Sequence, residues 1–131
     1  MIKVMVFGTF DCLHSGHLHL FKQAKSYGEK LIVVLARDQN VEKIKGKLPL
    51  NNEADRLELV SALKIVDFAV LGDLADYLKA IRDYQPDVVC LGYDQINFVD
   101  ELKSNFQNLK IIRLEPYQPN FYKSSKIKKI I

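Results

Sequence analysis

Two histidines spaced three residues apart, His14 and His17, are the side chains of this sequence best suited to chemistry on an anion. They lie in the segment GTFDCLHSGH, which runs from Gly8 to His17 and follows a short apolar run. Gly8 lets the backbone turn where a side chain would crowd a ligand. Gly16 stands at a helix entry, where free N–H groups and the helix dipole attract phosphate. Imidazole donors at this place suit the charge that develops on phosphoryl oxygens, so the segment predicts a phosphate site with His14 and His17 as catalytic groups.

The histidine pair has two other interpretations, which stay open at this point. A metal site would need a third ligand of the usual kind, and none is evident nearby. A structural pair that caps the helix needs only the observed spacing. Asp11 either orients a histidine or a metal, or serves only as a turn-forming residue. Cys12 lies in the same loop, but nothing there supplies the third group of a nucleophilic triad, so we interpret it as a lining residue.

Five short apolar runs alternate with helical patterns, which predicts right-handed crossovers and a parallel sheet. The expected strands are residues 3–7, 31–36, 68–71, 87–91 and 110–114. The expected helices are one that contains Leu18, Phe21 and Ala24 and is capped by Gly28, one that starts at Asn52, one over 74–84, one over 99–106 and a short one after Ser124 and Ser125. The predicted fold class is α/β, a Rossmann-like, doubly wound, five-stranded parallel sheet with helices on both faces, and residues 1–131 form a single domain.

Composition excludes several classes of protein. The chain has 131 residues, is 48% hydrophobic and 27% charged, and has no apolar stretch of the length a membrane span needs. Its N-terminal apolar run is too short for a signal peptide, so we expect a cytoplasmic protein without a membrane partner. The net charge of +3, without an aromatic stacking platform, argues against nucleic acid. The lysines at 43, 45 and 47 suit a polyanionic small ligand, with plain solubilising surface charge as the alternative.

The segment from Gly8 to His17 resembles the signature of the cytidylyltransferase-like nucleotidyltransferase superfamily, because it combines GTFD with HSGH. That superfamily includes glycerol-3-phosphate cytidylyltransferase, phosphopantetheine adenylyltransferase and archaeal FAD synthase. Its third element, a hydroxyl pair at the start of a late helix, is similar to KSSKI at residues 123–127. The likeness covers nearly the whole chain and is greatest to archaeal FAD synthase, through GYDQ at 92–95, ARD at 36–38 and KGK at 45–47.

This resemblance implies an enzyme that transfers AMP from ATP to FMN, giving FAD and pyrophosphate by in-line attack at the α-phosphorus. It implies that the nucleotide contacts are Thr9, Phe10, His14, Ser15, Gly16, His17, Asp94, Tyr122, Ser124 and Ser125. Lys45, Lys47 and Arg56 would contact phosphate or the acceptor substrate. A divalent cation, Mg²⁺, would be held mainly by phosphate oxygens, with no dedicated metal ligands from the protein. We also expect a homodimer, the commonest soluble oligomer.

Two alternative functions stay open. A cytidylyltransferase would use CTP and a polyol or sugar phosphate, but Gln118 stands where glycerol-3-phosphate cytidylyltransferases carry an arginine. Against the flavin assignment, some archaeal FAD synthases carry cysteines near the C-terminus, and this chain has none after Cys90. A non-catalytic nucleotide-binding module would bind ATP without turnover, and it would have less need of both histidines.

Overall fold

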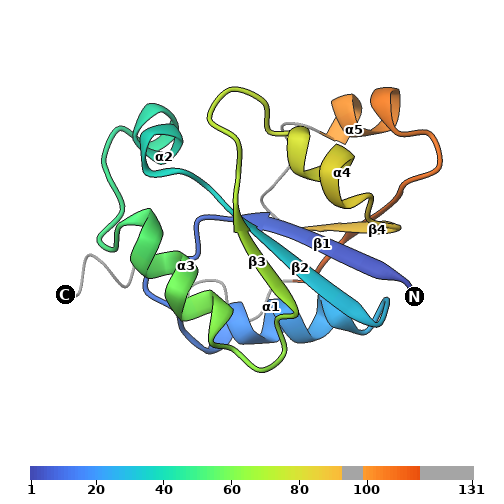
Figure 1. Ribbon diagram of the computed structural model, residues 1–131, viewed down its shortest axis with the longest axis horizontal. Coiled ribbons are helices and arrows are strands. Elements are labelled where there is room, and N and C mark those ends of the chain that lie inside the picture. Colours follow the sequence, from blue (N-terminus) through green and yellow to red (C-terminus); the bar gives the residue numbers. More distant parts are fainter. Residues whose placement is uncertain (93–98, 116–131) are drawn as a thin grey trace.

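The computed structural model describes residues 1–92 and 99–115, and all of its strands belong to one parallel sheet. The strands are β1 (Lys3–Gly8), β2 (Lys30–Leu35), β3 (Phe68–Leu71), β4 (Val88–Leu91) and β5 (Lys110–Arg113). Their order across the sheet is β3-β2-β1-β4-β5 (Figure 1). The five predicted strands are therefore confirmed, each to within one residue at its ends.

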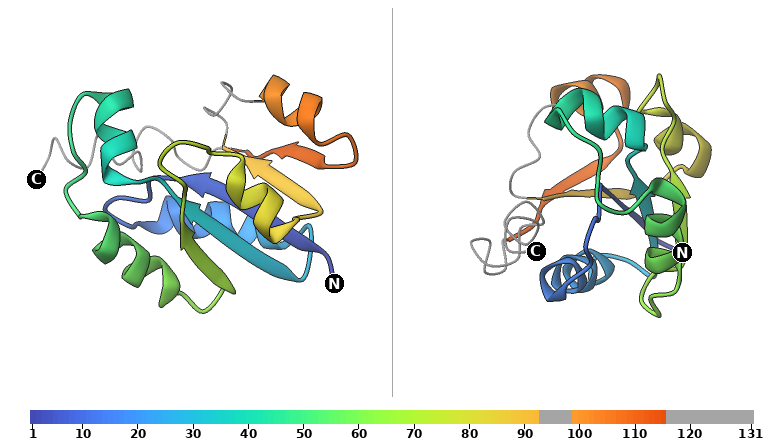
Figure 2. Two further views of the ribbon diagram at one scale, coloured as in Figure 1. Left: turned by 45° about the horizontal axis from the view of Figure 1, so that its top comes forward. Right: turned by 90° about the vertical axis from the view of Figure 1, so that its left-hand side faces the viewer.

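Helices cover both faces of this sheet, as expected for a doubly wound fold. They are α1 (Ser15–Lys25), α2 (Asp38–Lys45), α3 (Glu53–Ser61), α4 (Lys79–Tyr84) and α5 (Val99–Asn105). Figures 1 and 2 show α1 and α3 on one face and α4 and α5 on the other. The predicted α/β, Rossmann-like class is confirmed.

Successive side chains of β1 point to opposite faces of the sheet, and both faces are buried, which explains why its central sequence is uniformly apolar. Val4 and Val6 belong to a core cluster that includes Phe21 of α1 and Val60 of α3. Met5, between the two valines, belongs to the opposite cluster, which includes Ile81 of α4 and Leu102 of α5. A strand that is covered on both faces needs apolar residues at every position.

Two helix predictions differ from the structure, and one helix was not predicted. The helix expected over 74–84 is only α4, because the Asp73 carboxylate accepts hydrogen bonds from the backbone N–H groups of Ala75 and Asp76 and so favours a turn there. α2 was not expected; it buries only Val41 and ends at Gly46, whose φ is 80°. α1 ends with Ser26 as its C-cap, and not at Gly28. The helix expected after Ser124 and Ser125 lies outside the described residues.

Candidate active site

The strand order places the predicted site at the switch point of the sheet. β1 is followed by a helix on one face, and its neighbour β4 is followed by a helix on the other face. In open α/β sheets, ligands bind beyond the carboxyl ends of the strands at such a switch point. The loop between Gly8 and Ser15 begins at this point and leads directly into α1.

His14 and His17 form a capping box at the start of α1. His14 is the N-cap, and its Nδ1 accepts a hydrogen bond of 3.0 Å from the backbone N–H of Gly16. In return, Nδ1 of His17 accepts a hydrogen bond of 3.3 Å from the backbone N–H of His14. The geometry of a helix-capping pair, one of the interpretations left open by the sequence, is thus present in the structure.

These hydrogen bonds determine where the protons of the two rings lie. A nitrogen that accepts a hydrogen bond carries no proton, so each neutral imidazole has its proton on Nε2. The rings of His14 and His17 stack with centroids 3.9 Å apart and planes 26° apart. The pair therefore has two N–H donors on adjacent rings, and Nε2 of His14 is buried; donors of this kind suit the oxygens of a phosphate group.

Burial keeps both rings neutral near pH 7. It lowers the pKa of His14, and it lowers the pKa of His17 to about 3, with a further decrease from the neighbouring His14 and a smaller opposing effect of Asp11. α1 has no acidic residue in its first turn, whereas Asp38 begins α2 and two acids lie in the first turn of α3. The positive end of the α1 dipole is thus not compensated by its own side chains.

Phe10 supports the histidine pair from the core side. Its buried ring makes an edge contact with His17, with centroids 5.6 Å apart, and a tilted contact with Phe21 at 5.0 Å. A Cβ atom added to Gly8 would lie 2.6 Å from the Phe10 ring. Gly8 is therefore required by the close approach of this ring.

The loop that carries these residues has two non-glycine residues in the left-handed region. Phe10 and Cys12 both have φ of 54°. Such conformations are disfavoured for residues with a Cβ atom, and they persist where the surrounding structure determines them fully. Cys12 is half-buried in this loop, while Cys90 lies in the core, where burial raises the pKa of its thiol to about 12.

Asp11, for which the sequence left two roles open, bonds to a distant segment of the chain. Its buried carboxylate accepts hydrogen bonds from the backbone N–H groups of Leu50 (2.7 Å) and Asn51 (3.0 Å). The sequence did not indicate this link, because the partners are backbone groups 39 and 40 residues away.

Arg56 is fully buried, and its described bonds all go to the protein. Its guanidinium donates to the carbonyl oxygens of Thr9 (2.8 Å) and Asn51 (3.1 Å) and forms an ion pair of 2.6 Å with Asp38. The contact of Arg56 with the acceptor substrate stays a prediction. Asp38 was missed as a candidate residue; the signal available was its place at the start of α2, three residues after the end of β2 and so at the carboxyl edge of the sheet.

Two further predicted site residues lie at the start of α1, and two lie at or just beyond the end of α2. Ser15 is exposed at the start of α1, and Gly16 is half-buried beside it. Lys45 ends α2, and Lys47 follows two residues later; both are exposed. The remaining predicted nucleotide contacts fall outside the described residues: Asp94, Tyr122, Ser124 and Ser125.

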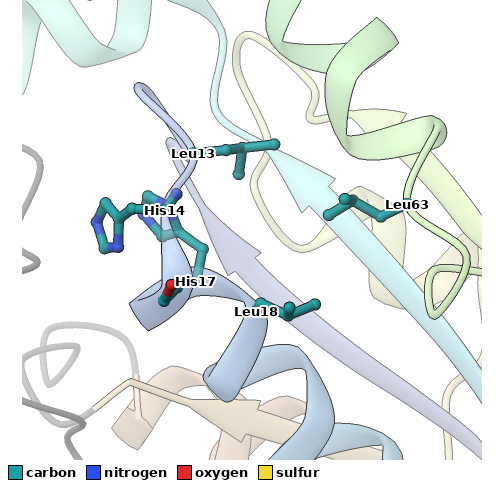
Figure 3. Close-up of a pocket in the computed structure, with 6 residues that line it drawn as sticks. Leu13, His14, His17, Leu18 and Leu63 are labelled. Carbon is teal, nitrogen blue, oxygen red and sulfur yellow. The ribbon is translucent and has the colours of Figure 1, made fainter.

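An open hollow of about 210 Å³ adjoins the histidines (Figure 3). It reaches from the start of α1 to the residues that follow α3, and three leucines supply most of its apolar wall. The lining residues are Leu13, His14, Ser15, His17, Leu18 and Leu63.

Carboxylates near the histidines are engaged by the protein. Asp11 accepts from two backbone N–H groups, and Asp38 pairs with Arg56 and also accepts from the backbone N–H of Glu53. Within residues 1–92 and 99–115, no group of three or more His, Cys, Asp or Glu side chains is arranged to hold a metal ion. In the same part of the chain, no helix has the length and apolar character to cross a membrane.

Comparison with known proteins identifies the family. The cytidylyltransferase-like family model matches residues 5–130. The chain belongs to the cytidylyltransferase-like family. Within this family it is 42% identical over 135 residues to the FAD synthase of Thermoplasma volcanium, with 100% of the chain and 94% of the relative covered. It is 42% identical over 136 residues to the FAD synthase of Methanohalophilus mahii, with the same two shares covered.

One solved structure supports the same family, and a second shares the fold. A crystal structure of a Thermoplasma volcanium protein, described as a lipopolysaccharide core biosynthesis protein, matches with a TM-score of 0.84 and 43% identity, covering 90% of this chain and 99% of that one. Pantoate-beta-alanine ligase from Francisella tularensis matches with a TM-score of 0.62 and 20% identity, covering 99% of this chain and 66% of that one. The second match shows a shared fold alone. The predicted membership of this cytidylyltransferase-like family is confirmed.

Proposed function

We propose that the protein is an FAD synthase, an FMN adenylyltransferase that joins AMP from ATP to FMN and releases pyrophosphate. The observation that carries the proposal is the histidine pair at the switch point of the sheet, with both Nδ1 atoms accepting backbone N–H groups. The relatives named FAD synthase support the choice of FMN and ATP, because they match over the full length of the chain.

The reaction requires positioning and charge stabilisation more than proton transfer. A phosphate monoester with a second pKa near 6 is largely dianionic at neutral pH. An oxygen of the FMN phosphate attacks the α-phosphorus of ATP, and the bond from that phosphorus to the bridging oxygen of the β-phosphate breaks. Pyrophosphate leaves with the electron pair of this bond. No general base and no covalent intermediate are needed.

His14 and His17 act in this step as neutral donors. Their Nε2–H groups stabilise the charge that builds on the α-phosphate oxygens. A charged imidazolium pair is disfavoured, because the two rings stack at 3.9 Å and are partly buried. The N-terminus of α1, at Ser15 and Gly16, adds the positive end of the helix dipole at the same place, while the backbone N–H of Gly16 itself donates to Nδ1 of His14.

The remaining predicted contacts complete the proposal. Thr9 and Phe10 belong to the loop below the nucleotide, and Lys45 and Lys47 neutralise the outer phosphates. Asp94, Tyr122, Ser124 and Ser125 contribute further nucleotide contacts, and Arg56 lies on the acceptor side. Mg²⁺ bound to the triphosphate would offset its charge, and phosphate oxygens and water would provide most of its ligands. The carboxylates of Asp11 and Asp38 already have protein partners, which fits a cation that is carried by the nucleotide.

The proposal further includes a single domain over residues 1–131, a cytoplasmic location and a homodimer. ATP and FMN are small soluble substrates, and the enzyme has no need of nucleic acid or a membrane. Sedimentation at micromolar concentration tests the dimer.

The decisive experiment measures pyrophosphate release with FMN as the acceptor, comparing ATP with CTP at constant Mg²⁺. We expect release that requires both ATP and FMN, with FAD as the product. Release only with CTP, or only when a polyol phosphate replaces FMN, would assign the protein to the cytidylyltransferases. Tight ATP binding without turnover under every condition would instead indicate a nucleotide-binding module.

A further inference from the structure

A buried carboxylate connects the histidine loop to the segment that follows α2. Asp11 is 1% exposed, and each of its oxygens accepts a backbone N–H group, from Leu50 and from Asn51. Removing a carboxylate from water is unfavourable unless hydrogen bonds to the charged form replace the hydration. The two backbone amides supply that replacement, so their position is coupled to the position of the loop.

Arg56 makes a second connection between the same two segments. Its guanidinium donates to Thr9 in the histidine loop and to Asn51, and its remaining described partner is Asp38 at the start of α2. Arg56 is fully buried. The Asp11 carboxylate thus links the loop to the backbone N–H groups of residues 50–51, and the Arg56 guanidinium links it to the carbonyl oxygen of Asn51.

Each connected segment carries groups proposed to contact the triphosphate. The histidine loop leads to His14, and it holds Phe10 and Cys12 at φ of 54°, a conformation that needs external support. The other segment begins with Lys45 and Lys47, which are exposed and lie only a few residues before the amides that Asp11 binds. A shift at residues 50–51 would therefore move the lysines relative to the histidines.

We infer that Asp11 and Arg56 are positioning residues, which hold the Lys45–Lys47 segment and the histidine loop at a fixed separation so that one triphosphate contacts both. This inference rests on the proposed function. In this inference, Asp11 acts by fixing the backbone of residues 50–51, which lie between α2 and α3. Arg56 acts by fixing the same segment, and this role requires no direct contact between Arg56 and the acceptor.

A mutant cycle tests whether Asp11 acts through the lysines. The variants are Asp11→Asn, the pair Lys45→Ala with Lys47→Ala, and all three changes together. Asparagine keeps the shape of Asp11 but places an NH₂ group against a backbone N–H. We expect Asp11→Asn to raise the KM for ATP about tenfold, and to add less than about threefold when the lysines are already absent. Multiplicative effects, or an unchanged KM in Asp11→Asn, would overturn the inference.

Amide hydrogen exchange gives a readout that does not depend on turnover. In Asp11→Asn we expect the amides of Leu50 and Asn51 to lose protection by about tenfold or more, while the core amides of β1 keep theirs. Unchanged protection at both amides would also overturn the inference. If Asp11→Asn does not fold, Arg56→Lys takes its place in the cycle, because lysine keeps the charge and loses the forked geometry.

Asp67→Asn is the matched control. The Asp67 carboxylate accepts from the backbone N–H of Leu31 (2.8 Å) and from Lys25 Nζ (2.7 Å), at the amino edge of the sheet. We expect this variant to lose stability while its KM for ATP stays that of the parent. If the lysine pair can be replaced without any change in KM, the inference fails, while FAD formation by the parent protein would still support the proposed function.

Discussion

The two edges of the parallel sheet use the same kind of contact for different purposes. At the amino edge, Asp67 accepts the backbone N–H of Leu31 in β2, and Asp87 accepts that of Lys3 in β1, within a regular backbone. At the carboxyl edge, Asp11 does the same, but it is buried and lies between Phe10 and Cys12, which are held at positive φ. The amino edge thus illustrates stabilisation of a fold, and the carboxyl edge illustrates stabilisation of a loop that would not adopt its shape alone.

The largest expected difference between the edges concerns catalysis by His17. His17→Ala removes one of the two donors and half of the capping box. We expect kcat to fall by about 10²–10³-fold, with a stability loss of about 1 kcal/mol from the cap. Asp87→Asn at the amino edge should leave kcat unchanged. Steady-state FAD formation together with urea denaturation measures both quantities, and an unchanged kcat in His17→Ala would remove the histidine from the mechanism.

The next comparison is between Gly8 at the carboxyl edge and Gly28 at the amino edge, because neither has room for a side chain. A Cβ atom on Gly8 would lie 2.6 Å from the Phe10 ring, and one on Gly28 would lie 2.7 Å from the Ile2 carbonyl oxygen. We expect each alanine variant to lose roughly 1–3 kcal/mol of stability. Only Gly8→Ala should also lower kcat, because its neighbour Phe10 supports His17. Equal kcat values in the two folded variants would contradict this assignment.

The free energy of unfolding should also depend on pH differently through the groups at the two edges. Burial lowers the pKa of His17 from 6.5 to about 3, so the unfolded chain takes up a proton on this ring at a higher pH than the folded chain. The free energy of unfolding is therefore unaffected by this group above pH 6.5, and it decreases as the pH falls from 6.5 towards 3. That loss amounts to roughly 1 kcal/mol per pH unit.

At the amino edge the corresponding group is a carboxylate. Hydrogen bonds from Lys25 and Leu31 hold the pKa of Asp67 below its ordinary value of 3.8, although desolvation opposes them, so its contribution is lost only at lower pH. Urea denaturation between pH 7 and 4.5 should show a shallower decline for His17→Gln than for the parent protein. The same decline in both would indicate that His17 titrates normally in the folded state.

The smallest expected effect belongs to Cys12. Cys12→Ala should keep kcat within about threefold of the parent value, because the transfer uses no covalent nucleophile and alanine at φ of 54° has much the same backbone cost. FAD formation by the purified variant measures this. Loss of activity in a folded Cys12→Ala protein would require a chemical role for the thiol.

The sheet was predictable from sequence because its strands are short apolar runs between amphipathic helices. α2 was not, since its sequence DQNVEKIK has only two apolar residues, Val41 and Ile44, and buries only Val41. The helix over 74–84 was predicted too long, because the apolar spacing of Leu74 and Tyr77 conceals the turn that Asp73 forms with its own backbone.

The site was predictable where the chemistry is local. The spacing of His14 and His17 indicated two rings at one helix start, and their capping geometry was one of the interpretations considered. The burial of Arg56 was not predictable, since its partner Thr9 lies 47 residues away and the contact is to a backbone carbonyl. The contacts of these residues with ATP or FMN remain predictions.

The absence of acids from the first turn of α1 has a consequence for how substrates arrive. α1, α2 and α3 all begin at the carboxyl edge, but acids lie in the first turns of α2 and α3 only. A polyanion that approaches the start of α1 therefore meets no acidic side chain in the first turn of that helix, and the positive end of the helix dipole favours its approach. Such steering acts on the rate of encounter and weakens as ionic strength rises, so added salt should slow ATP association more than it alters dissociation.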